Sequence, residues 1–150
     1  MRAFSTYLLI LILTLSGCRD NIPTTVYSNP KSQGFTFEKV SFGMLVKNPD
    51  KYHRKNIELT GSYLTGFEKS ALYPGNYFNE SQRAIWIMFH PDLPLMNTKT
   101  GINLFDSYKE IEKISGRRIR VKGKFDMDSH GHLGAYFGEL YYVVSIEVLN

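Results

Sequence analysis

Several features of enzymes and of many secreted proteins are missing from this sequence of 150 residues. It contains one cysteine, Cys18, so no disulfide can form within the chain. It has no Gly-rich phosphate loop, no HExxH motif of zinc proteases and no GxSxG motif of serine hydrolases. The charge balance, 18 Lys and Arg against 14 Asp and Glu, is too mild to indicate a nucleic-acid partner.

The longest apolar stretch lies at the N-terminus, from Ala3 to Leu15, directly after the basic residue Arg2. A helix over this stretch would span about 20 Å at about 1.5 Å per residue, whereas a hydrocarbon core is about 30 Å thick. A charged start, a short apolar centre and small residues at the end are typical of a secretory signal peptide. The sequence therefore predicts a signal peptide over residues 1–17 and not a membrane span.

This stretch ends in LSGC, from Leu15 to Cys18, which resembles the lipobox of bacterial lipoproteins. The resemblance implies cleavage before Cys18, which then carries a diacylglyceryl group and an amide-linked acyl chain such as palmitate. Each buried CH₂ contributes about 0.8 kcal/mol to membrane binding, so three acyl chains would anchor the protein permanently. Because Cys18 is the single cysteine, its acylation would leave the protein no free thiol. In that family an Asp after the cysteine retains the protein in the inner membrane. Arg19 stands there instead, which implies the outer membrane, facing the periplasm.

Residues 18–35 are rich in Pro, Ser, Thr and Asn and contain few apolar side chains. Such a composition buries little surface, so we expect a flexible tether that lifts a domain off the bilayer. The remaining residues, 36–150, have a length that suits one domain with one hydrophobic core.

Two segments of this domain are similar: RKNIELTGSYL (Arg54 to Leu64) and GRRIRVKGKFD (Gly116 to Asp126). Both alternate apolar and polar residues, with the period of a half-buried strand. Both also place a glycine, Gly61 or Gly123, where the apolar face expects a side chain, which often marks a bulge or a tight bend. Two copies are too few for a solenoid, so we expect paired, curved strands of one small barrel.

The other segments predict two short helices and three further strands. Ser41 is a candidate N-cap of a helix that ends at Pro49. A second helix is expected over residues 102–115, before Gly116 as a C-terminal cap; the residues at helical spacing are Leu104, Tyr108 and Ile111. An irregular strand or a hairpin is expected at 71–79, which contains Pro-Gly, and strands are expected at the apolar run AIWIMFH (84–90) and in the C-terminal segment. The expected inner face of that last strand comprises Leu140, Tyr142, Val144, Ile146 and Val148.

The resulting order, a helix, three strands, a helix and two strands, resembles the OB-fold, a five-stranded barrel with a helix between strands three and four. The predicted fold class is therefore mainly β with one or two short helices, and a β-sandwich is the alternative. The phrases KNIELTG, GRRIRVKGKF and GHLGAYFGELYYV also resemble small bacterial envelope lipoproteins with OB-like domains. These motifs are structural, so the resemblance implies no catalytic residue.

One segment, DMDSHGHLG, carries potential metal ligands at every second position: Asp126, Asp128, His130 and His132. In an extended strand these side chains would share a face and could bind zinc. A calcium loop starting here would need a bidentate Glu where Phe137 stands. Gly131 and Gly134 instead favour a turn. We therefore expect a hairpin connection between strands four and five, with no metal and no other cofactor.

Three groups of side chains remain to be weighed. Glu110 and Glu112 face different ways on the second helix, so we interpret them as exposed surface and not as an acid–base pair. Alternating basic residues on strand four could meet anionic lipid headgroups or an acidic partner, although such a row is usually only a solvated face; they are Arg118, Arg120, Lys122 and Lys124. Aromatic residues in strands two and three could form a binding face or fill the core; they are Tyr73, Tyr77, Trp86 and His90.

The sequence thus predicts an outer-membrane lipoprotein whose OB-like domain is a binding module of the bacterial envelope and not an enzyme. The expected partners are the membrane, through the lipid on Cys18, and an envelope protein or anionic envelope component. Nucleic acid, a common OB-fold ligand, is not expected outside the cytoplasm. One alternative is a metal-dependent envelope hydrolase that uses Asp126–His132. Another is a structural or inhibitory partner of a second envelope protein.

Overall fold

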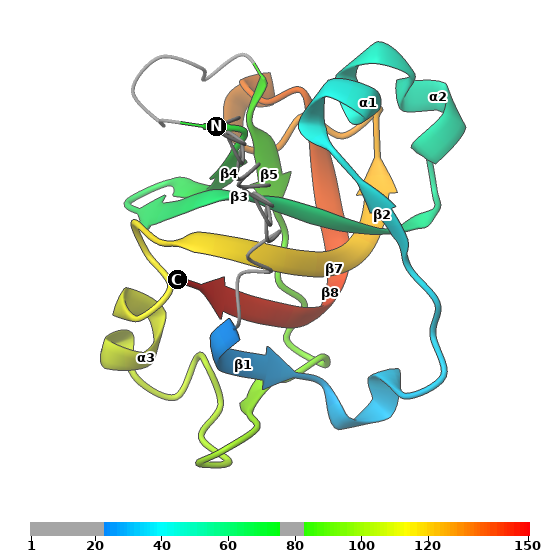
Figure 1. Ribbon diagram of the computed structural model, residues 1–150. Coiled ribbons are helices and arrows are strands. Elements are labelled where there is room, and N and C mark those ends of the chain that lie inside the picture. Colours follow the sequence, from blue (N-terminus) through cyan, green and yellow to red (C-terminus); the bar gives the residue numbers. More distant parts are fainter. Residues whose placement is uncertain (1–22, 76–82) are drawn as a thin grey trace, which may run out of the picture.

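The computed structural model describes residues 23–75 and 83–150 (Figure 1). Its strands are β1 (Pro23–Ser28), β2 (Glu38–Val40), β3 (Asn56–Gly66), β4 (Lys69–Tyr73), β5 (Ile85–Ile87), β6 (Met96–Asn97), β7 (Arg118–Asp126) and β8 (Gly138–Leu149). Its α-helices are α1 (Phe42–Lys47), α2 (Pro49–Tyr52) and α3 (Tyr108–Glu112), and two 3-10 turns are η1 (Pro30–Ser32) and η3 (His132–Gly134). The predicted signal peptide, Cys18 and Tyr77 lie outside the described residues.

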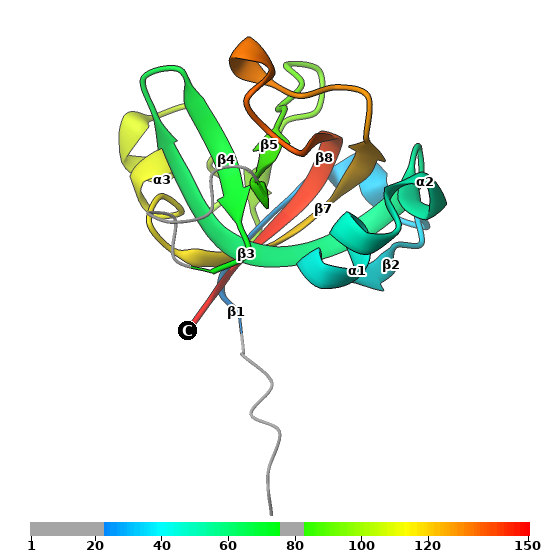
Figure 2. The ribbon, with the colours of Figure 1, turned by 90° about the horizontal axis from the view of Figure 1, so that it is seen from above.

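Five strands close into a barrel, because each pairs with two others around a ring. The order around the ring is β3, β4, β5, β8 and β7, and β7 pairs with β3 again. Helix α3 lies between β5 and β7 in the chain, and α1 and α2 lie together at one end of the barrel (Figures 1 and 2). The prediction of a mainly β fold with a small five-stranded OB-like barrel is therefore confirmed. Among the described helices, none is long and apolar enough to cross a membrane.

The two similar sequence segments form β3 and β7, which pair antiparallel with each other. Ile57 pairs with Gly123, and Gly61 pairs with Ile119, so each glycine lies opposite an apolar residue of the other segment. A Cβ on Gly61 would overlap the carbonyl oxygen of Tyr73 and lie 2.9 Å from Leu72 Cγ, so Gly61 permits a close approach of strand β4.

The second glycine marks a bulge, as the sequence predicts. The pairing of β7 with β8 shifts register between Lys122 and Lys124, on either side of Gly123. On the facing strand, Tyr142 takes a left-handed conformation with φ of 46° and is 51% exposed. The predicted inner face of β8 is therefore wrong at Tyr142 and Val144, because the bulge breaks the alternation and turns Val143 inward instead.

Alternate residues of β3 and β7 fill the barrel, with burial that follows the strand period. The largest fully buried side chains include Tyr27, Tyr52, Tyr63 and Phe125, and they belong to one continuous core with the inward residues of β5 and β8. Burying each large apolar side chain contributes about 1.5–3 kcal/mol. This core therefore provides the main stabilisation of the barrel.

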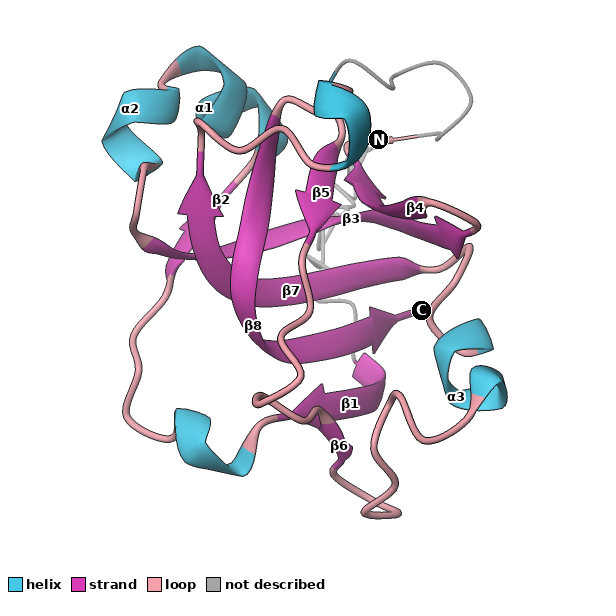
Figure 3. Cartoon of the chain, turned by 180° about the vertical axis from the view of Figure 1, so that it is seen from behind, coloured by secondary structure: helices cyan, strands magenta, loops and turns pink. Residues whose placement is uncertain are grey.

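The predicted tether over residues 18–35 is wrong from Pro23 onward. Strand β1 pairs with β8 from Pro23 to Ser28 and with β6 at its end, and extends the sheet beyond the barrel (Figure 3). Tyr27 is fully buried. The Thr, Val and Tyr residues of the segment TTVYS favour a strand. The prediction of a tether missed this local preference because it used the average composition of residues 18–35. The folded domain therefore includes β1 and does not begin at residue 36.

Helix α3 is shorter than the sequence predicts, because Ser107 caps it and Leu104 lies in the preceding loop. The Glu110 carboxylate, expected at the surface, is buried and accepts a 2.7 Å hydrogen bond from the Tyr27 hydroxyl. It also binds the Lys113 ammonium. The hydrogen bonds from Lys113 and Tyr27 lower the Glu110 pKa. Burial, and next the bond to Glu110, raise the pKa of Tyr27 to about 12. This contact joins α3 to β1.

Candidate functional site

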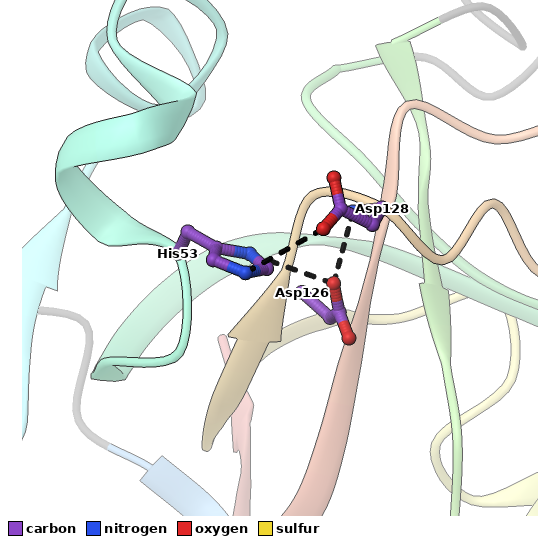
Figure 4. Close-up of side chains that lie close together, drawn as sticks. All are labelled: His53, Asp126 and Asp128. Atoms are coloured by element: carbon purple, nitrogen blue, oxygen red, sulfur yellow. Dashed lines mark hydrogen bonds and ion pairs between the residues drawn. The ribbon is translucent and has the colours of Figure 1, made fainter.

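Two of the predicted metal ligands meet a histidine from another part of the chain (Figure 4). Asp126 ends β7 and Asp128 follows it, while His53 lies between α2 and β3. Nδ1 of His53 lies 3.5 Å from Asp126 Oδ1, and Nε2 lies 3.6 Å from Asp128 Oδ2. One potential ligand atom from each residue lies within 4.8 Å of the other two. An imidazole and two carboxylates are donors that zinc accepts.

The hydrogen bonds of this cluster stabilise the turn. The Met127 N–H donates to His53 Nδ1 at 3.2 Å, and the Asp128 N–H donates to Asp126 Oδ1 at 2.9 Å. The His53 and Asp126 side chains thus accept hydrogen bonds from the two backbone N–H groups that follow the end of β7. Because Nδ1 of His53 accepts the bond from the Met127 N–H, the proton of the neutral ring lies on Nε2, which faces Asp128 Oδ2 at 3.6 Å. The Asp128 side chain is 70% exposed. The cluster therefore fixes the start of the β7–β8 connection, and could hold a metal through His53 only if the bond from the Met127 N–H were lost.

The two histidines of the same segment point elsewhere. His130 Nδ1 lies 3.0 Å from the Tyr136 carbonyl oxygen. His132 Nε2 lies 3.3 Å from Glu68 Oε2, and the His132 ring stacks on Trp86 at a centroid distance of 6.4 Å. The four predicted ligands therefore do not converge. The segment forms the connection between β7 and β8, with positive φ at both of its glycines, as the sequence predicts.

An exposed apolar surface that the sequence analysis missed lies where this connection meets the β3–β4 turn. Phe67 is 93% exposed and Leu133 is 88% exposed. The contact of His132 with Glu68 joins the two turns that carry them, so we call Phe67, Glu68, His132 and Leu133 the loop-tip surface. Glu68 and Leu133 both take positive φ, of 51° and 54°. Only the tertiary contact between the turns reveals this surface.

The predicted aromatic residues do not form one platform. Tyr73 is buried with Ala71 and Ala84, and burial raises the pKa of its hydroxyl. Trp86 is half-buried against Tyr136, at a centroid distance of 5.1 Å. His90 lies 5.6 Å from the Tyr142 ring. Trp86 thus packs against His132 of the loop-tip surface, and Tyr73 belongs to the core.

The predicted basic row on β7 is largely neutralised by two glutamates of the neighbouring strands. Arg120 lies 2.6 Å from Glu147 and 3.4 Å from Glu58, and Lys122 lies 3.6 Å from Glu58 and 3.7 Å from Glu147. Arg118 is exposed at the start of the strand. Lys124 stands apart, with its ammonium 5.9 Å from the centre of the Tyr141 ring. The row therefore offers no continuous cationic surface.

Comparison with known proteins finds no matching family model, no matching curated protein and no matching solved structure.

Proposed function

We propose that this chain is a lipoprotein of the bacterial outer membrane whose OB-like barrel binds a protein partner through the loop-tip surface. The observation that carries the proposal is the exposure of Phe67 and Leu133, by 93% and 88%, on two turns that contact each other. Large exposed apolar surfaces are typical of interaction sites. LSGC at the start of the chain supports the anchor at Cys18.

The place of β1 favours a partner in solution over the chain's own membrane. Only residues 19–22 separate Cys18 from Pro23, a link of at most about 18 Å. Pro23 pairs with Leu149 near the C-terminus. Figure 2 shows this end of the sheet on the opposite side of the barrel from the β3–β4 turn and η3. An anchor at Cys18 would therefore hold the barrel close to the membrane and turn the loop-tip surface away from it.

The contacts beneath the loop-tip surface favour tight binding. His132 is held by Glu68 at 3.3 Å and by stacking on Trp86. Gly131 packs so closely on Trp86 that an added Cβ would lie 2.5 Å from Trp86 Cγ. Because the turns are ordered before binding, a partner with an apolar recess would lose less free energy to their immobilisation. Burial of Phe67 and Leu133 would contribute about 1.5–3 kcal/mol each.

Photocrosslinking in intact cells tests this function. A photoreactive phenylalanine replaces Phe67, Leu133 or, as the control, Tyr108, which is 74% exposed and lies on α3. We expect the same protein adduct from positions 67 and 133 and not from 108. Adducts with lipid alone, or an equal pattern at all three positions, would contradict the proposal.

The alternative of a metal-dependent hydrolase is favoured by one observation, the meeting of His53 with Asp126 and Asp128. Only two of the residues predicted for that site take part, and the backbone occupies one ligand atom of His53. A zinc-dependent change in melting temperature, described below, distinguishes this function from the binding module.

A further inference from the structure

A hollow of about 340 Å³ lies beside the bulged part of β8, between η1 and the start of β3. Its apolar walls include Phe35, Phe37, Leu93 and Val144, with Tyr142 at the lip. Ligand sites for small molecules are mostly apolar and have volumes of about 300–1,000 Å³. The hollow is therefore large enough for a single small apolar group. It shares no residue with the loop-tip surface.

The charges around the hollow are all of one sign. Lys31 and Lys124 line it, and no Asp or Glu is among its lining residues. Neither lysine takes part in an ion pair between described residues. Arg120 and Lys122, further along the same face of β7, are neutralised by Glu58 and Glu147. The basic row predicted from the sequence thus keeps an uncompensated charge only where Lys124 reaches the hollow or where Arg118 faces solvent.

The lip of the hollow carries a strained backbone. Tyr142 has φ of 46°, a conformation that an aromatic residue rarely adopts. The bulge opposite Gly123 holds it there, and its ring contacts Tyr141 and His90 at centroid distances of 5.1 and 5.6 Å. Strain of this kind persists where the surrounding structure fixes it, and often accompanies a binding site.

We propose that this hollow binds a small amphipathic anion. A single apolar chain packs against Phe35, Leu93 and Val144, and a carboxylate or phosphate lies between the ammonium groups of Lys31 and Lys124. The volume favours one short chain over a two-chain lipid. This site is independent of the proposed partner-binding function, because it lies on other residues.

Calorimetric titration with decanoate, decyl phosphate and decanol, all below their micelle concentrations, tests the site. The protein is the purified chain with Cys18→Ser, which prevents acylation. The test variant is Lys31→Gln with Lys124→Gln, and the matched control is Lys39→Gln with Lys109→Gln, two exposed lysines away from the hollow. Circular dichroism melts verify that each variant is folded.

We expect one decanoate per chain, with decyl phosphate similar and decanol at least tenfold weaker. The test variant lowers decanoate affinity to that of decanol, and the control variant leaves it unchanged. Equal binding of decanol, no effect of the test variant, or no saturable binding would overturn the proposal. So would phosphatidylglycerol vesicles that bind the protein and displace decanoate, since they would identify a bilayer surface as the ligand.

Discussion

Gly61 offers the sharpest test of the barrel, because strand β4 passes too close to it for any side chain. A Cβ at this position would overlap the Tyr73 carbonyl oxygen and lie 2.9 Å from both Leu72 Cγ and Phe42 Cε2. Ser62, the next residue, pairs with Tyr73. Gly61→Val therefore cannot be accommodated by a side-chain rotation alone, and β4 must move away from β3.

The cost of this substitution can be bounded. Overpacking of a core costs about 1–3 kcal/mol, and the forced shift of paired backbone places Gly61→Val in the upper part of that range. For a domain of this size, 1 kcal/mol changes the melting temperature by about 3–6 °C. We therefore expect a loss of about 2–3 kcal/mol and a decrease of roughly 6–18 °C.

Thermal melts followed by circular dichroism measure this effect. Gly66→Val is the matched control, because Gly66 lies at the end of the same strand and an added Cβ would meet nothing within 4 Å. We expect the control to melt within about 2 °C of the wild type, as surface substitutions usually do. Equal melting temperatures for Gly61→Val and the wild type would refute the close approach of β3 and β4.

Three further predictions concern the anchor, the metal alternative and the contact between β1 and α3. Labelling of cells with a palmitate analogue should mark the wild type and not Cys18→Ala; a label that survives the substitution would refute the anchor. Zinc should leave the melting temperature unchanged, whereas His53→Ala should lower it with or without zinc, because Nδ1 accepts the Met127 N–H. A zinc-dependent rise in melting temperature that His53→Ala abolishes would favour the metalloenzyme. Zinc at a hundred times its dissociation constant would then stabilise the folded protein by about 2.7 kcal/mol. Because the Tyr27 pKa is raised in the folded state, the wild type should lose stability as pH rises from 10 to about 12. Denaturant titrations across pH should show that Tyr27→Phe removes this loss. The wild type should also lose stability as pH falls below 4.5 through the lowered pKa of Glu110, and an unchanged profile in Glu110→Gln would contradict that contribution.

The local sequence pattern was sufficient to predict the two barrel strands β3 and β7. Alternation and a shared glycine predicted β3 and β7 and their pairing, because half-burial of a strand imposes a period of two on its own residues. The N-cap at Ser41 was also local, and its hydroxyl accepts the Met44 N–H at 3.2 Å. These features need no knowledge of distant residues.

The missed features depend on residues far apart in the chain. Strand β1 is ordered by pairing with β8 and by the bond from Tyr27 to Glu110, neither of which its composition indicates. The bulge at Gly123 was predicted, but its effect on the facing strand β8 was not, because the alternation of β8 looks continuous in the sequence. His53 lies 74 residues before Met127, and the antiparallel register of β3 with β7, in which Asn56 pairs with Lys124, brings it beside Asp126. The sequence predicted that these strands pair but not their register, so it did not identify the cluster.

The affinity of the crosslinked partner for the purified chain is the measurement that tests binding through the loop-tip surface most directly. Phe67→Ser and Leu133→Ser remove the two apolar side chains, and Tyr108→Ser removes another exposed side chain, from α3. A loss of about 1.5–3 kcal/mol per side chain predicts at least about tenfold weaker binding for each loop-tip variant. The control should bind within about twofold of the wild type. Unchanged affinity in both loop-tip variants, or an equal loss in Tyr108→Ser, would contradict the proposed binding surface.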